Sequence, residues 1–91
     1  MNHLLLAAIQ ILPIADAHKK NEAFAKAQHV VEQSGLHFHV DNFEIAIEGS
    51  YEQIMRVVEA VQLSIYNAGI EELILNVRLH SNKTKDVKLK K

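Results

Sequence analysis

Cysteine and tryptophan are absent from this chain of 91 residues, proline occurs once, and glycine occurs three times. Without cysteine, neither a disulfide framework nor thiolate chemistry is available. A low content of glycine and proline, together with 48% hydrophobic residues, is typical of a globular chain rather than a disordered one. The length is enough for one compact domain with one hydrophobic core.

Strong net charge and long apolar runs are also lacking. A net charge of −1 gives no general attraction to nucleic acid or to an anionic membrane. No stretch approaches the ~20 apolar residues that a membrane helix needs. The apolar segment from Leu4 to Ile9 is short and has no positive flank, which argues against a signal peptide. We therefore expect a cytoplasmic protein with no membrane insertion and no nucleic-acid partner.

Hydrophobic patterning predicts four strands and two helices. The predicted strands cover residues 3–12, 36–40, 43–48 and 72–80, and the first helix covers residues 21–34. A second helix begins at the capping box of Ser50 and Gln53 and ends before Gly69. Asp41 and Asn42 tolerate positive φ, so they predict a two-residue hairpin between the second and third strands.

The order strand, helix, strand, strand, helix, strand predicts the fold class. Each half is a strand–helix–strand unit, and right-handed crossovers place both helices on the same side of an antiparallel sheet. This is the ferredoxin-like βαββαβ sandwich of the α+β class, with strand order 4-1-3-2. We predict a single domain over residues 1–80. Residues 81–91, which contain five Lys and one Asp, are predicted to be a frayed tail unless a partner holds them.

Side chains of a strand alternate between faces, so the polar residues of the four strands gather on the face that no helix covers. The candidate ligand-binding residues on this face are Ala8, Gln10, Glu44, Ala46, Glu48, Asn76 and Arg78. Ala8 and Ala46 are unusual, because surface positions of strands favour larger side chains. They leave room for a flat ligand, for the sheet of a second subunit, or for both.

The chain has no motif that predicts an enzyme. Phosphate-binding glycine loops, zinc-ligand spacings and nucleophile elbows are absent from the sequence. Glu44 and Glu48 are about 13 Å apart at ~3.3 Å per residue, too far for a glycosidase carboxylate pair. His37 and His39 are predicted at the opposite sheet edge from His80, which argues against a shared metal. Carboxylates on the central strands also argue against RNA. We expect no catalytic residue, metal or cofactor.

Several segments carry a resemblance to a known family. They are Ala8–Pro13, Val30–Leu36, Ile45–Gly49 and the stretch from Ile54 to Val77. Together they resemble the thiamine-binding protein family, the small single-repeat relatives of the YkoF-like proteins. The most specific feature is a strand that ends in Glu48-Gly49 with a helix start immediately after it.

The resemblance implies a non-enzymatic protein that binds thiamine or its hydroxymethylpyrimidine moiety for thiamine-precursor salvage or transport. It also implies a homodimer or homotetramer assembled through the sheet. For such a ligand, carboxylates would face the thiazolium cation or accept from the exocyclic amine, while Gln10 and Asn76 would pair with ring nitrogens. The alternative is a homo-oligomeric interaction module whose polar face binds no small molecule.

Overall fold

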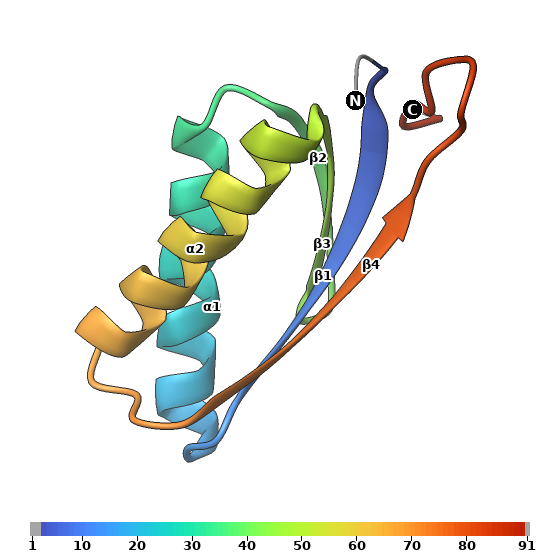
Figure 1. Cartoon of the computed structure of the whole chain (residues 1–91). Helices are drawn as coiled ribbons and strands as arrows, with labels where there is room; N and C mark the ends of the chain where they lie inside the picture. The colour runs from blue at the N-terminus through green and yellow to red at the C-terminus, as the bar shows by residue number, and fades with distance from the viewer. Residues whose placement is uncertain (1–2, 91) are drawn as a thin grey trace.

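The computed structural model of the chain describes residues 3–90. Its elements are β1 (Leu5–Pro13), α1 (Ala17–Gln33), β2 (His37–Asp41), β3 (Glu44–Gly49), α2 (Tyr51–Asn67) and β4 (Leu73–His80). The sheet order is β2-β3-β1-β4, and every neighbouring pair of strands is antiparallel. Both helices lie on one side of the sheet (Figure 1). The predicted ferredoxin-like fold and its strand order are confirmed.

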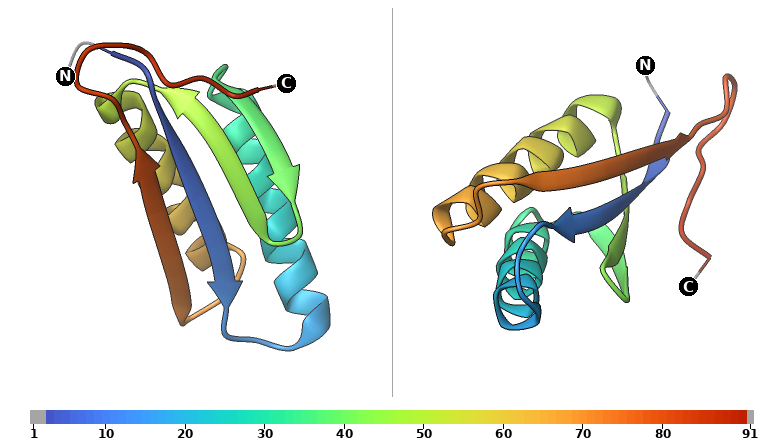
Figure 2. Two further views of the ribbon diagram at one scale, coloured as in Figure 1. Left: turned by 90° about the vertical axis from the view of Figure 1, so that its right-hand side faces the viewer. Right: turned by 90° about the horizontal axis from the view of Figure 1, so that it is seen from below.

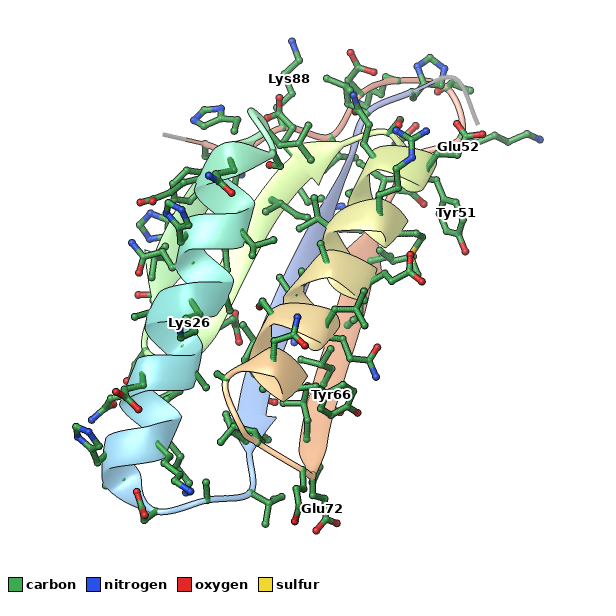
Figure 3. All side chains as sticks on the ribbon, turned by 90° about the vertical axis from the view of Figure 1, so that its left-hand side faces the viewer. Lys26, Tyr51, Glu52, Tyr66, Glu72 and Lys88 are labelled. Atoms are coloured by element: carbon green, nitrogen blue, oxygen red, sulfur yellow. The ribbon has the colours of Figure 1, made fainter. Side chains whose placement is uncertain are left out.

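The hydrophobic core lies between the sheet and the helices. Its buried residues are Leu5, Ala7, Ile9, Ile11, Ala23, Ala27, Val31, Ile45, Ile47, Ile54, Val57, Val61, Ile65 and Ile70. The strand residues among them follow period two and the helix residues follow helical spacing, as each element requires to bury one face. Long polar side chains such as Lys26 cover the outer side of the helices (Figure 3). Neither of the described helices is long and apolar enough to cross a membrane.

Helix α1 begins at Ala17, four residues before the predicted start. The carboxylate of Asp16 caps this end by accepting a hydrogen bond of 2.9 Å from the Lys19 amide. The first buried residue of α1 is Ala23, so the apolar pattern starts later than the helix itself. At the other end, Gly35 has a φ of +77°, the left-handed conformation that is typical of a residue ending a helix.

The hairpin between β2 and β3 is displaced by one residue from its predicted place. Asp41 pairs with Glu44, so Asn42 and Phe43 form the turn. Phe43 has a φ of +55°, which is uncommon for an aromatic residue. Its ring packs against Phe24 of α1 with centroids 5.2 Å apart, and its carbonyl accepts from the Ile11 amide at 2.9 Å. These contacts hold the turn in this conformation.

Helix α2 begins with the predicted capping box. The Gln53 amide donates to Ser50 Oγ at 3.1 Å, and the Ser50 amide donates to Gln53 Oε1 at 2.9 Å. The helix therefore starts immediately after the end of β3 at Gly49. This places the last residues of β3 next to a fixed helix start.

The chain after β4 folds back across one end of the uncovered sheet face (Figure 2). Residues 86–90, here called the C-terminal strap, are held by Leu4, immediately before β1, and by Glu48 of β3 rather than frayed. Leu4 donates to Asp86 Oδ1 at 2.8 Å and accepts from the Val87 amide at 3.0 Å. The Leu89 amide donates to Glu48 Oε1 at 2.9 Å. The partner that holds the tail is thus the sheet of the same chain.

Candidate functional site

The register of the sheet arranges its uncovered side, here called the open face, in three rows across the strands. The row next to the strap is His80, Leu6, Glu48 and His37; the middle row is Arg78, Ala8, Ala46 and His39; the third row is Asn76, Gln10, Glu44 and Asp41. All seven predicted binding residues lie in these rows. Period-two alternation therefore placed each of them on the open face, as the sequence predicted.

A cavity of about 530 Å³ lies on the open face. Its lining residues are Leu6, Ala7, Ala8, Ala46, Arg78, Leu79, His80 and Ser81. Ala8 and Ala46 are directly opposite each other on β1 and β3, so only methyl groups rise from the middle of the sheet. The longer side chains of Arg78 and His80 border this low area from β4. We call this hollow the open-face cavity.

Two carboxamides are joined in the third row. Asn76 Nδ2 donates to Gln10 Oε1 at 3.0 Å, linking β4 to β1. This bond uses one donor of Asn76 and the acceptor of Gln10. The Nε2 of Gln10 and the Oδ1 of Asn76 therefore provide the complementary donor and acceptor that the pair presents to another molecule.

Glu44 and Arg78 form an ion pair across β1, with Nη2 and Oε2 3.9 Å apart. The Arg78 side chain is 78% exposed and the Glu44 side chain 37% exposed, so water screens this contact. Arg78 thus links the third row to the cavity wall, since it contacts Glu44 and lines the open-face cavity. The pair is weak enough for either partner to turn toward a ligand.

Glu48 is the most enclosed of the acidic residues on the open face, with 15% of its side chain exposed. Its Oε1 accepts from the Leu89 amide at 2.9 Å and lies 3.9 Å from His37 Nδ1. Its cross-strand neighbour on β1 is Leu6, which lines the open-face cavity. The carboxylate therefore stands between the cavity and the C-terminal strap.

The structure divides the predicted set into three groups. Ala8, Ala46 and Arg78 line the open-face cavity. Gln10, Glu44 and Asn76 form the row on one side of it, and Glu48 lies in the row on the other side. Gln10, Glu44 and Glu48 face away from the helices, as expected, but the two alanines separate Glu48 from the others.

Five lining residues were not among the predicted set: Leu6, Ala7, Leu79, His80 and Ser81. Leu6 could have been predicted from the sequence, because it continues the period-two series of Ala8 and Gln10 by one step toward the N-terminus. Ser81 follows the last residue of β4, so alternation gave no information about it. Within residues 3–90, no group of three His, Asp or Glu side chains is placed to hold a metal ion.

Comparison with known proteins was made for both sequence and structure. No curated protein matches the chain. A domain of unknown function (DUF77) from Bacillus cereus is 26% identical, with a TM-score of 0.87 over 96% of this chain and 84% of that one. A protein from Streptococcus pneumoniae is 16% identical, with a TM-score of 0.81 over 89% of each chain.

A candidate thiamine biosynthesis/salvage protein of Thermotoga maritima is also similar in structure. It is 16% identical, with a TM-score of 0.79 over 87% of this chain and 84% of that one. The family model described as "Thiamine-binding protein" matches residues 7–91, a region that includes the strap and all of the open face except Leu6. The chain therefore belongs to the thiamine-binding protein family.

Proposed function

We propose that this protein binds thiamine or its hydroxymethylpyrimidine moiety on the open face, without changing it chemically, in thiamine-precursor salvage or transport. Membership of the thiamine-binding protein family supports the ligand class. The description of the Thermotoga maritima protein, which shares the fold, supports the pathway. The observation that carries the proposal is the open-face cavity, whose 530 Å³ lies within the ~300–1,000 Å³ typical of small-molecule sites.

The chemistry of the open face suits a flat aminopyrimidine. Leu6, Ala8 and Ala46 offer an apolar floor for one side of a ring. The Gln10–Asn76 pair offers an amide N–H to a ring nitrogen and an amide oxygen to an exocyclic amine. Glu44 and Glu48 supply negative charge on either side of the cavity for a thiazolium cation.

The groove between the helices suits this ligand less well. It has a volume of about 340 Å³ and is lined by Val30, Gln33, Ser34, Leu36, Gln53, Arg56, Val57 and Ala60. Its only charged side chain is the cationic Arg56, which would repel a thiazolium. The open face, with carboxylates beside an apolar floor, is the better complement.

We also propose that the protein is not an enzyme. His80 and Ser81 both line the cavity, yet no hydrogen bond joins them in the described part of the chain, and both are exposed. A nucleophile needs a base within hydrogen-bond reach to activate it. The cavity walls therefore favour binding over covalent chemistry.

Isothermal titration calorimetry with thiamine and with hydroxymethylpyrimidine tests the proposal. Wild type is expected to bind at least one of them, and Ala46→Leu to bind about tenfold more weakly or worse, because the larger side chain fills the cavity floor. Asp41→Leu is the matched control, since it adds the same side chain to the open face outside the cavity. No heat from wild type with either ligand contradicts the function, and equal affinity of Ala46→Leu contradicts the location.

Self-assembly is a second candidate function, and the exposed apolar residues of β4 favour it. Ile74, Val77 and Leu79 are 47%, 37% and 43% exposed, and β4 is an edge strand. Val77 and Leu79 face the helix side, where the exposed Tyr51 of α2 also lies (Figure 3), and Ile74 faces the open side. Exposed apolar patches and free strand edges are typical of subunit contacts. We propose a homodimer or homotetramer that uses the sheet.

Native mass spectrometry of the purified protein tests this assembly, because it gives the subunit number and the mass of any small molecule that remains bound. A dimer or tetramer that Val77→Lys dissociates would support it, and a monomer at micromolar concentration would contradict it. Location in the cytoplasm stays a prediction from composition.

A further inference from the structure

The C-terminal strap occupies a carboxylate that the proposed function assigns to the ligand. Glu48 Oε1 accepts the Leu89 amide at 2.9 Å, in a partly buried position. The carboxylate has two oxygens and could accept more than one donor, but only 15% of the Glu48 side chain is exposed while the strap is closed. A ligand amine or cation that approaches from the cavity therefore finds little of the carboxylate accessible. The closed strap thus restricts the access of a ligand to Glu48.

The strap is built to lie on the sheet. Val87 and Leu89 are half-buried, whereas Lys88 and Lys90 are exposed, which is the alternation of an extended segment with one apolar side. Two anchors at its start fix its position, because Asp86 Oδ1 accepts from the Leu4 amide at 2.8 Å and lies 3.5 Å from His3 Nδ1. The contact with Glu48 is thus a specific one, at a defined residue of the segment.

The strap is also built to be released. Among the described residues, its backbone amides bond to the rest of the chain only at Val87 and Leu89, and it is not a strand of the sheet, in contrast to β4, which pairs with β1 over eight residues. A short turn precedes it, in which Asn82 Oδ1 accepts from the Thr84 amide at 3.0 Å. Segments with few buried apolar contacts open at low free-energy cost while the rest of the fold stays closed.

From these observations we propose that the C-terminal strap regulates the ligand site by competing for Glu48. In the ligand-free protein, the Leu89 amide satisfies the carboxylate and the strap is closed. A bound ligand takes the carboxylate and the strap opens from Glu48 while Asp86 stays anchored at the Leu4 amide. This inference rests on the proposed function, since it assumes that Glu48 contacts the ligand.

Proline substitution in the full-length chain isolates the contact. Leu89→Pro removes the one N–H that reaches Glu48, and Lys90→Pro removes the next N–H, for which the described residues offer no acceptor. Thiamine affinity by calorimetry is expected to increase about fivefold in Leu89→Pro, because the competent open form becomes dominant. Lys90→Pro is expected to match wild type.

Amide exchange measured by NMR gives a second readout. The Leu89 amide is expected to exchange slowly in ligand-free wild type and faster at saturating thiamine, while the Val87 amide, bonded to Leu4, keeps its protection. A Leu89 amide that is unprotected without ligand, or equally protected with it, overturns the competition.

The outcomes separate the two claims. If wild type binds and Leu89→Pro binds equally well or more weakly, the regulation is overturned but the proposed function stands. A weaker affinity of Leu89→Pro would mean that the strap forms part of the binding site. Absence of binding to all three proteins overturns the proposed function and the regulation with it.

Discussion

The two faces of the sheet hold their residues in different ways. On the helix side, Ile9, Ile45 and Ile47 are fully buried with 0% exposure. On the open face, polar side chains pair with one another at the surface, as Asn76 does with Gln10 and Arg78 with Glu44. Burial of apolar area stabilises the fold far more than such exposed pairs do.

This contrast indicates where recognition can reside. Residues of β3 alternate between the faces, so Ile47 belongs to the core while Ala46 and Glu48 on either side of it face outward. A change at Ile47 should therefore alter the folding free energy with little direct effect on a ligand. A change at the neighbouring Ala46 or Glu48 should instead alter ligand binding with little effect on the folding free energy. The predictions below test that separation, beginning with the largest expected effect.

Ile47→Ala is expected to lower the free energy of unfolding by about 2–5 kcal/mol, because it removes buried methyl groups and leaves a cavity in the core. Urea denaturation followed by circular dichroism measures the loss. His39→Ala on the open face is the control, with an expected change within about 0.5 kcal/mol. Similar losses for both variants would contradict the separation of the two faces.

Ser50→Ala is expected to cost about 1 kcal/mol, since it removes the hydroxyl that accepts from the Gln53 amide at the start of α2. The same denaturation experiment applies. Ser64→Ala is the matched control, because its hydroxyl only donates to the Val61 carbonyl of the same helix and alanine favours helix. A control that loses as much as Ser50→Ala would show that the cap is not the cause.

The sequence was sufficient to predict the architecture because local and global signals agree in most elements. Period two marks the strands, and the capping box marks the start of α2. The first helix was misplaced at its start because the turns before Ala23 bury no apolar residue. There the only signal is Asp16, a cap that periodicity does not detect.

For the site, the sequence could predict only which face of the sheet, and which row across the strands, each residue occupies. Alternation assigns Glu44 and Glu48 to the open face, but it contains no information about long-range contacts of the tail. Leu4 and Asp86 lie 82 positions apart in the chain, and two apolar residues in a lysine-rich segment do not define a strand. The occupation of Glu48 by the strap was therefore beyond what patterning predicts.

The smallest expected effect concerns the Arg78–Glu44 pair. A double-mutant cycle with Arg78→Ala and Glu44→Ala is expected to give a coupling of about 0.5 kcal/mol or less, because both side chains are exposed and 3.9 Å separates the charges. Unfolding in urea at low and high salt measures it, and the small coupling should shrink further with salt. A coupling well above about 1 kcal/mol would mean that the open face contributes to the fold, so that Arg78 and Glu44 could not turn toward a ligand without cost.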